Sequence, residues 1–386
     1  MRWVVHYAEI GLKGRNRPRF EQQLRENLER SLRALGPVRT RNLWGRLLVE
    51  LPGDAPPEEV RRRLRGVFGV AYFSEVSVCE PEISALEKAV DEFIAERSFK
   101  SFGIRARRSE KSHPFTSSDL ARHLGTRVAE ASGARVDLND PELWIEIHVL
   151  AQQALLLHER HQGPGGMPVG SGGRALCLIS GGIDSPVASY AMLKRGLALR
   201  YAHFHSSPFT SAASQDKVRD LVARLAEHQG PVSLFLIPFG EIQQHLVREA
   251  PSGPRIVLYR RFMIRIAEAV AQRERALALI TGESLGQVSS QTLGNLDTIN
   301  RAATLPLLRP LIGTDKAEII EQARKIGTFE ISIEPDEDCC SYLMPRNPAT
   351  WTRPKEIEAL EASLDVSGLV ERALAGVVRE RIEPRS

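Results

Sequence analysis

The second half of the chain contains four short apolar runs that do not alternate with polar residues. They are ALCLIS, ALRYAHFH, VSLFLIP and ALALITG, beginning at Ala175, Ala198, Val232 and Ala276. Parallel strands that are buried on both faces have this pattern, and helix-like stretches separate the runs. The pattern predicts a doubly wound α/β domain, whose ligands bind at the carboxyl ends of the strands.

The first of these runs leads directly into the segment SGGIDS, residues 180–185. We expect Gly181 and Gly182 to turn the backbone with positive φ and to bring N–H groups close to an anion. A helix beginning near Ser185 would then favour a phosphate at its N-terminus. The carboxylate of Asp184 suits such a loop if it holds Mg²⁺ or orients the loop.

The loop has neither the spacing of a Walker A motif nor that of a dinucleotide fingerprint. It resembles the pyrophosphatase (PP) loop of enzymes that cleave ATP, adenylate a substrate and release pyrophosphate. The alternative is a tight glycine turn that caps a helix without binding a ligand.

The first half of the chain predicts two smaller α+β domains that precede the α/β domain. Residues 2–7, 42–51 and 70–80 read as strands separated by helices, an order typical of a ferredoxin-like unit. A further helix–strand–helix pattern ends in two strands, 143–150 and 153–160, that we expect to form a hairpin. We place the domains at residues 1–58, 59–161 and 174–386, with a glycine-rich linker at 162–173.

The composition is that of a soluble protein of several domains. The 386 residues include no apolar run long enough to cross a membrane, and the N-terminus lacks the features of a signal peptide. Four cysteines make no disulfide framework, so we expect a cytoplasmic, reduced protein. Residues 1–50 hold 11 Lys and Arg against five Asp and Glu, whereas the whole chain has a net charge of +4. This excess favours contact with phosphates, although a solvated basic surface explains it equally well.

Six stretches of the α/β domain together resemble the tRNA 4-thiouridine synthetase (tRNA uridine 4-sulfurtransferase) family. They are LISGGIDSPVASYAMLKRG, HFHSSPFTS, LYRRFMIRIAE, ITGESLGQVSSQTLGNL, RPLIGTDKAEII and EDCCSYLMPRNPAT. The N-terminal HYAEIGLKGRNRPRFEQQLREN is similar to the ferredoxin-like start of that family. FGIRARRSEKSHPFTSSDLARHLG with VDLNDPELWIEIHV resembles its THUMP domain, an RNA-binding module. The resemblance covers nearly the whole chain.

The resemblance implies that ATP binds in the crevice at the strand ends. The residues that it places on ATP are Leu178, Ile179, Ser180, Gly181, Gly182, Asp184, Ser185, His203, Phe204, Arg260, Gly282 and Gln291. Arg260 can pair with phosphates, but its neighbour Arg261 could take the same role. Lys316 matches a lysine that the family needs for activity. A cation in the first turn of a helix is electrostatically unfavourable, which supports a role for Lys316 at the phosphates over that of a solvated surface lysine.

The family's chemistry implies a sulfur carrier in this chain. Adenylation turns a uracil oxygen into a good leaving group, and a persulfide on the cysteine matching Cys340 then delivers sulfur. Cys339 is the nearest thiol that could resolve the resulting bond, and an external thiol is the alternative. No cysteine or histidine spacing indicates a metal site. We expect Cys177 and Cys79 to be core residues.

The substrate that the resemblance implies is tRNA, thiolated at uridine 8. Candidate phosphate contacts are Arg105, Arg107, Arg108 and Lys111, although an exposed basic strand edge would look the same. Longer family members carry a rhodanese-like domain that this sequence lacks, so we expect a separate cysteine desulfurase to load Cys340. A role in thiamine biosynthesis is therefore doubtful. We also expect a homodimer.

Two other functions remain open on the sequence alone. The chain could be another PP-loop ligase or amidotransferase acting on a small molecule, but residues 1–161 would then have no task. It could instead be a tRNA-binding protein with a degenerate nucleotide site, although SGGIDS, Arg260, Lys316 and Cys340 are all intact.

Overall fold

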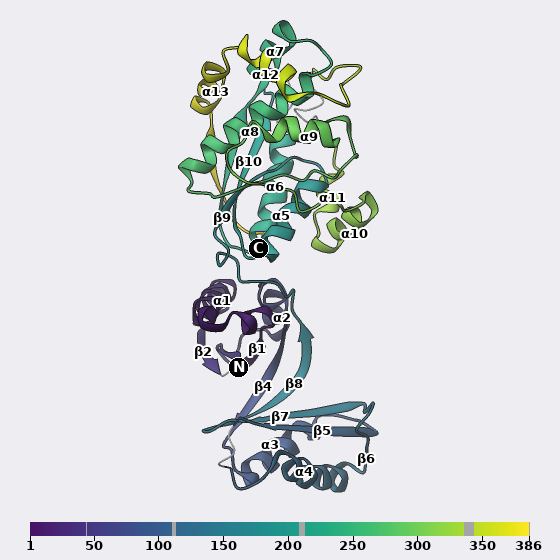
Figure 1. The fold of residues 1–386 in the computed structure, drawn as a ribbon. Coiled ribbons are helices and arrows are strands. Elements are labelled where there is room, and N and C mark those ends of the chain that lie inside the picture. The colour runs from purple at the N-terminus through teal and green to yellow at the C-terminus, as the bar shows by residue number, and fades with distance from the viewer. Residues whose placement is uncertain (44, 110–112, 208–212, 336–342, 386) are drawn as a thin grey trace. The chain divides into compact units, whose positions relative to one another are not determined.

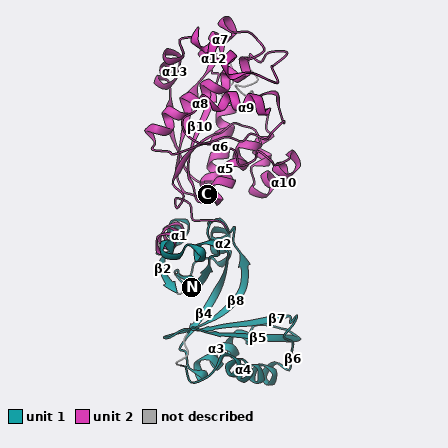
Figure 2. Cartoon of the chain, in the orientation of Figure 1, with its two compact units in different colours: residues 1–17, 28–165 teal, residues 18–27, 166–386 magenta. Residues whose placement is uncertain are grey.

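The computed structural model describes residues 1–43, 45–109, 113–207, 213–335 and 343–385. The chain divides into two compact units, each with its own β-sheet (Figure 1, Figure 2). Unit 1 comprises residues 1–17 and 28–165, and unit 2 comprises residues 18–27 and 166–386. Helix α1 (Arg17–Leu32) contributes residues to both.

Unit 1 is built on an eight-stranded sheet with the order β2-β3-β1-β4-β8-β7-β5-β6. Its pairs are antiparallel, except that β5 runs parallel to both β7 and β6. The strands are β1 (Arg2–His6), β2 (Arg39–Leu43), β3 (Arg46–Glu50), β4 (Tyr72–Cys79), β5 (Ser101–Arg108), β6 (Arg135–Val136), β7 (Leu143–Val149) and β8 (Ala154–Gln162). The expected hairpin is confirmed, since β7 and β8 pair antiparallel.

One strand prediction in unit 1 is wrong. Residues 42–51 were expected to form a single strand, but β2 and β3 meet here as an antiparallel pair in which Leu43 lies opposite Arg46. Gly45 adopts a φ of +80°, a conformation that side chains rarely tolerate, and so allows the reversal. A glycine inside an apolar run marked this turn in the sequence.

Among the described residues, three α-helices lie wholly within unit 1: α2 (Pro57–Leu64), α3 (Ile83–Ala95) and α4 (Ser117–Ser132). Helices α3 and α4 pack their apolar faces on β5 and β7 around a buried cluster that includes Leu86, Phe102 and Leu124. Thr116 caps α4 through the backbone N–H of Asp119, and Asp119 accepts from the N–H of Thr116 in return.

Unit 2 contains the expected α/β sheet, with the order β13-β12-β9-β10-β11-β14. The first five strands are parallel, and β14 is an antiparallel edge strand. The strands are β9 (Arg174–Leu178), β10 (Ala198–His205), β11 (Val232–Pro238), β12 (Leu279–Ile280), β13 (Leu307–Leu308) and β14 (Val378–Ile382).

Helices cover this sheet and bury its apolar residues. They are α5 (Asp184–Lys194), α6 (Ala213–Ala226), α7 (Gly240–Glu249), α8 (Arg255–Arg273), α9 (Leu293–Asn300), α10 (Lys316–Ile326), α11 (Phe329–Ser332), α12 (Pro354–Ala362) and α13 (Val366–Ala375). Helix α8 supplies much of the core: its Phe262 and Ile266 are fully buried in one cluster with Leu176 of β9. Within the described residues, no helix is both long enough and apolar enough to span a membrane.

The glycine-rich segment after β8 makes ordered backbone contacts. Gly163 and Gly165 donate to the carbonyls of Ala71 and Val70 in unit 1, whereas Met167 and Gly170 donate to carbonyls at the end of α5 and just beyond it, in unit 2. The boundary between the units therefore falls between Gly165 and Gly166.

Candidate nucleotide site

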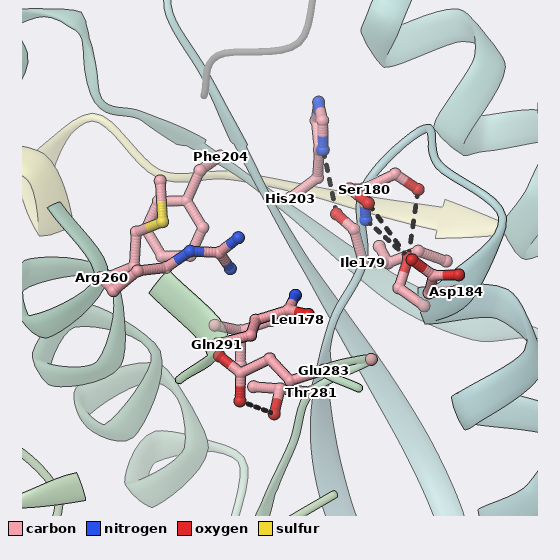
Figure 3. Close-up of a pocket in the computed structure, with 13 residues that line it drawn as sticks. Leu178, Ile179, Ser180, Asp184, His203, Phe204, Arg260, Thr281, Glu283 and Gln291 are labelled. Atoms are coloured by element: carbon pink, nitrogen blue, oxygen red, sulfur yellow. Dashed lines mark hydrogen bonds between the residues drawn. The ribbon is translucent and has the colours of Figure 1, made fainter. Parts of the chain in front are cut away.

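A pocket of about 670 Å³ lies at the carboxyl ends of the parallel strands of unit 2, open to solvent (Figure 3). Ten of the twelve residues predicted to contact ATP line it; Gly181 and Gly182 do not. Three lining residues were not foreseen: Met263, Thr281 and Glu283. Thr281 and Glu283 flank the predicted Gly282, so the position of that glycine after a strand could have indicated them.

Hydrogen bonds between serines hold the SGGIDS loop in its turn. The N–H of Ser180 donates to Ser185 Oγ (3.0 Å), and the N–H of Gly182 donates to Ser180 Oγ (3.3 Å). The expectation of positive φ at Gly181 and Gly182 is wrong, because neither is among the described glycines with positive φ. The buried Ser185 side chain, and not a left-handed glycine, organises the turn.

Gly282 allows two backbone segments to approach each other closely. A Cβ atom at this position would lie 2.7 Å from Ser185 N and 2.8 Å from Ser185 Cα. The end of β12 therefore packs directly on the first turn of α5, which fixes the loop relative to the pocket floor. Glu283, next in the chain, is buried and accepts hydrogen bonds from Thr281 Oγ1 and Arg309 Nε.

The neighbours Arg260 and Arg261 have different surroundings. Arg260 lines the pocket (Figure 3). Arg261 is buried, and its Nε and Nη2 atoms donate to the two carboxylate oxygens of Glu361 at 2.8 and 2.6 Å. Burial raises the pKa of Glu361, but hydrogen bonds from Arg261 and Arg265 outweigh this effect and lower the pKa. Of the two arginines, Arg260 therefore lies at the pocket, whereas Arg261 is bound to Glu361 away from it.

His203 and Gln291 contribute to the pocket through fixed side chains. His203 is buried, with its Nδ1 atom 3.0 Å from the carbonyl oxygen of Ile179. A carbonyl only accepts, so Nδ1 carries the proton. Gln291 Oε1 accepts from the N–H of Ser284 (3.3 Å) and holds the loop that follows β12.

Asp184 and Lys316 meet at the rim of the pocket, although 132 positions separate them in the chain. Lys316 Nζ donates to Asp184 Oδ1 at 2.5 Å, and Gln287 Nε2 donates to Asp184 Oδ2 at 3.0 Å. Asp315 caps α10 by accepting from the N–H groups of Ala317 and Glu318, which fixes Lys316 as the first residue of that helix. The arrangement places one cation and one carboxylate beside the N-terminus of α5, which favours an anion, while the N–H groups of Ser180 and Gly182 already donate to serine hydroxyls.

Comparisons with known proteins agree with this geometry. The family profile "Thiamine biosynthesis protein (ThiI)" matches residues 170–366, "ThiI ferredoxin-like domain" matches 2–74 and "THUMP domain" matches 80–159. A probable tRNA sulfurtransferase of Thermus thermophilus is 46% identical over 96% of this chain and 91% of its own length. A second, from Moorella thermoacetica, is 44% identical over 99% of this chain and 98% of its own. The chain belongs to the tRNA sulfurtransferase (ThiI) family.

A solved structure gives the same result for the fold. The crystal structure of a 4-thiouridine synthetase–RNA complex with bound ATP superposes with a TM-score of 0.90 at 36% identity, over 99% of both chains. The predicted fold class is confirmed: ferredoxin-like and THUMP domains precede a PP-loop α/β domain. As a member of this family, the chain is a tRNA sulfurtransferase.

The predicted sulfur carrier of this sulfurtransferase, Cys340, and its neighbour Cys339 lie outside the described residues. Described residues on both sides of that segment are anchored. Lys217 Nζ donates to the carbonyl oxygen of Glu334 (2.6 Å), and Ser332 Oγ donates to that of Gly182 in the PP loop (3.4 Å). Beyond the segment, Tyr259 donates to the carbonyl oxygen of Leu343 (3.4 Å). The hydrogen bond of Ser332 thus links the chain segment that precedes residue 336 to the PP loop.

The other two cysteines are packing residues. Cys177 is fully buried in β9 with its sulfur 3.1 Å from Ser189 Oγ, and burial raises its pKa to about 12. Cys79 is half-buried in β4, where burial also raises the pKa. Neither thiol is available as a thiolate near neutral pH.

The four basic residues predicted to contact RNA divide into four cases. Arg105 is exposed, with its guanidinium 3.5 Å from the ring centre of Trp144. Arg108 donates to the backbone carbonyls of His113 and Phe115, so it holds the loop before α4. Lys111 lies outside the described residues. Arg107 belongs to a larger group on the sheet of unit 1.

We call this group the arginine–histidine cluster: His6, Arg46, Tyr72, Arg107, His148 and Arg160. Its members come from six strands. The His6 and Tyr72 rings stack 4.2 Å apart, the Arg160 guanidinium lies 3.7 Å from the Tyr72 ring centre, and Arg46 Nη1 contacts His148 Nδ1. Sequence reasoning found only Arg107, because no local pattern shows which residues become neighbours across strands.

The arginine–histidine cluster is cationic through its arginines alone. Burial, followed by nearby positive charges, lowers the pKa of both His6 and His148 to about 3. Burial also lowers the pKa of Arg46, and Arg107 contributes. Within the described residues, Arg46, Arg107 and Arg160 form no ion pair with an acidic side chain. Three guanidinium groups without an acidic partner suit the phosphates of a nucleic acid, whereas both faces of the Tyr72 ring are already covered, by His6 and by Arg160.

Proposed function

We propose that this sulfurtransferase makes 4-thiouridine at position 8 of tRNA by adenylating uridine O4 with ATP. In the first step, O4 attacks the α-phosphorus of ATP, and pyrophosphate leaves. The observation that supports this step is the pocket, which Ser180, Asp184 and Arg260 line together and whose Asp184 pairs with Lys316. A similar protein has been solved with both RNA and ATP bound.

The residues around the pocket have distinct tasks in this proposal. The N–H groups of the PP loop and the N-terminus of α5 bind phosphate oxygens. Arg260 and Lys316 neutralise the negative charge that develops as pyrophosphate leaves. Asp184 fits Mg²⁺, since a carboxylate is the ligand that this hard cation prefers, and Mg²⁺ would supply further charge neutralisation at the phosphates.

The second step transfers sulfur from a persulfide on Cys340. Its outer sulfur attacks C4 of the adenylated uridine, the C4–O bond breaks, and AMP leaves. A thiol, either Cys339 or an external one, then attacks the Cys340 sulfur, so that the outer sulfur stays on the base and a disulfide forms. A reductant must restore the thiols, and a cysteine desulfurase is the proposed donor of the persulfide.

We further propose that the arginine–histidine cluster binds tRNA through its phosphates. Arg105 would extend this surface along β5. The chain would act in the cytoplasm and as a homodimer. These statements rest on charge and family resemblance, and tRNA titrations and sedimentation would test them.

Two measurements test the proposed function. Unmodified tRNA should stimulate pyrophosphate release, and Cys340→Ser should abolish thiolation while ATP and tRNA still bind. Full thiolation in Cys340→Ser would contradict the sulfur-carrier role. Pyrophosphate release at the same rate with and without tRNA would instead indicate a ligase acting on a small molecule. Binding of tRNA without any ATP turnover would indicate a tRNA-binding protein.

A further inference from the structure

Among the described residues, the hydrogen bond from Gln287 is the side-chain contact of Asp184 that neither the family resemblance nor the proposed chemistry assigns. Its amide nitrogen lies 3.0 Å from Asp184 Oδ2, while Lys316 occupies Oδ1. The three side chains come from α5, from α10 and from the loop after β12. Both oxygens of one carboxylate therefore have a separate donor.

The loop that carries Gln287 is held from several directions. The N–H of Gly286 donates to the carbonyl oxygen of Gln291 (2.9 Å), and the N–H of Leu285 donates to that of Ile312 (3.0 Å). Gly286 adopts a φ of +76°, which turns the backbone just before Gln287. The backbone on either side of Gln287 is therefore held, and its exposed side chain reaches Asp184 from there.

The two donors differ in what they do when a nucleotide enters. Lys316 is a flexible cation, and a triphosphate carries more negative charge than one carboxylate, so the phosphates compete for the ammonium group. The Gln287 amide is neutral and has no such competitor. It also does not repel a divalent cation at the carboxylate, whereas an ammonium group on the same oxygen does.

We propose that Gln287 is a positioning residue that holds Asp184 Oδ2, so that Oδ1 is correctly oriented for a divalent cation once Lys316 moves to the nucleotide phosphates. This inference rests on the proposed function, because it assumes that the pocket binds ATP with Mg²⁺. The inference adds Gln287 to the residues of the proposed site. It also adds a change of partners, in which Lys316 leaves Asp184 when the nucleotide binds while Gln287 keeps its hydrogen bond to Asp184.

The test is the Mg²⁺ dependence of ATP binding by the full chain without tRNA, measured by calorimetry with Mg²⁺ and with EDTA. Gln287→Met keeps the length of the side chain and removes the donor. A hydrogen bond to a charged group contributes about 1.5 kcal/mol, so ATP should bind about tenfold more weakly in Mg²⁺. In EDTA the affinity should stay within about twofold of that of the unchanged protein. The exposed Gln272→Met on α8 is the matched control and should change neither value.

A second variant reverses the electrostatics at the same place. Gln287→Glu puts a carboxylate beside Asp184, so ATP should bind more weakly than to the unchanged protein in EDTA and recover when Mg²⁺ is added. Equal losses of affinity for Gln287→Met in both conditions would overturn the proposal and leave Gln287 a structural residue. Unchanged affinity in both conditions would overturn it too. If the unchanged protein binds no ATP, the proposed function itself fails.

Discussion

Arg260 and Arg261 are adjacent on α8, yet one faces the pocket and the other the protein interior. Both appear in the same motif, so the sequence could not decide between them. The helix decides it: consecutive residues point about 100° apart, and the carboxylate of Glu361 lies on the side of Arg261. Residues of one type in one motif can thus have unrelated functions.

This difference predicts opposite phenotypes for two neighbouring substitutions. Arg261→Met leaves Glu361 buried with Arg265 as its remaining partner, and should lower the free energy of unfolding by about 3 kcal/mol. Arg260→Met should change it by less than about 1 kcal/mol but weaken ATP binding about tenfold. Chemical denaturation and ATP titration measure the two effects. A reversed pattern, with Arg260→Met the less stable protein, would contradict the assignment.

Gly282 provides a second test at the residue scale. Gly282→Ala would force a Cβ atom to within 2.7 Å of Ser185 N, so β12 and α5 must move apart. We expect a loss of about 1 to 3 kcal/mol in stability, together with weaker ATP binding because the PP loop shifts. Gly313→Ala, where a Cβ would meet no atom within 4 Å, is the matched control. Normal ATP affinity in Gly282→Ala would show that the loop tolerates the displacement.

At the scale of elements, the sequence predicted what local pattern encodes and missed what strand pairing creates. The apolar runs predicted the parallel strands β9 to β12, and SGGIDS predicted the loop, because each signal is contained within a few residues. Arg46 and His148 lie in β3 and β7, which three other strands separate in the sheet, so only the three-dimensional course of the sheet brings them together. The Gln287–Asp184 contact was missed for the same reason, since it joins residues 103 positions apart.

The strand pairing in unit 1 predicts a pH-dependent stability. His6 and His148 have a pKa of about 3 in the folded chain, against an ordinary value of 6.5. Below pH 6.5 both histidines are therefore protonated in the unfolded chain but stay neutral in the folded chain. The free energy of unfolding consequently decreases as the pH falls toward 3. Between pH 7 and 5.5 the loss should be about 1 kcal/mol per histidine.

Tryptophan fluorescence can follow this loss in unit 1 alone. With Trp351 changed to Phe, the remaining tryptophans all belong to unit 1. Urea denaturation at the two pH values should show the loss, and changing both His6 and His148 to Gln should reduce it. His158 and His161, whose pKa values burial also lowers, contribute the part of the loss that remains in unit 1. An undiminished difference in the double variant would mean that other groups titrate.

At the scale of the whole molecule, the nucleotide pocket and the arginine–histidine cluster lie in different units, so the binding of ATP and of tRNA can be measured separately. Unit 2 contains the nucleotide pocket, and unit 1 contains the cationic face of the sheet. Unit 1 has no part in the pocket lining, so substitutions in the arginine–histidine cluster should leave ATP binding intact. Each unit can therefore be altered while the other serves as the internal control.

A triple substitution, Arg46→Gln with Arg107→Gln and Arg160→Gln, tests this division. Each phosphate contact that is lost should reduce the slope of log K against log salt concentration by about 0.7 to 0.9, so tRNA binding should become weaker and less salt-dependent. ATP affinity should not change, and thiolation should recover at saturating tRNA, because KM rises while kcat is retained. Arg122→Gln is the matched control, since Arg122 is exposed in the same unit but already pairs with Asp119. An unchanged salt slope would place the RNA elsewhere on the chain, whereas a parallel loss of ATP affinity would show that the units do not act independently.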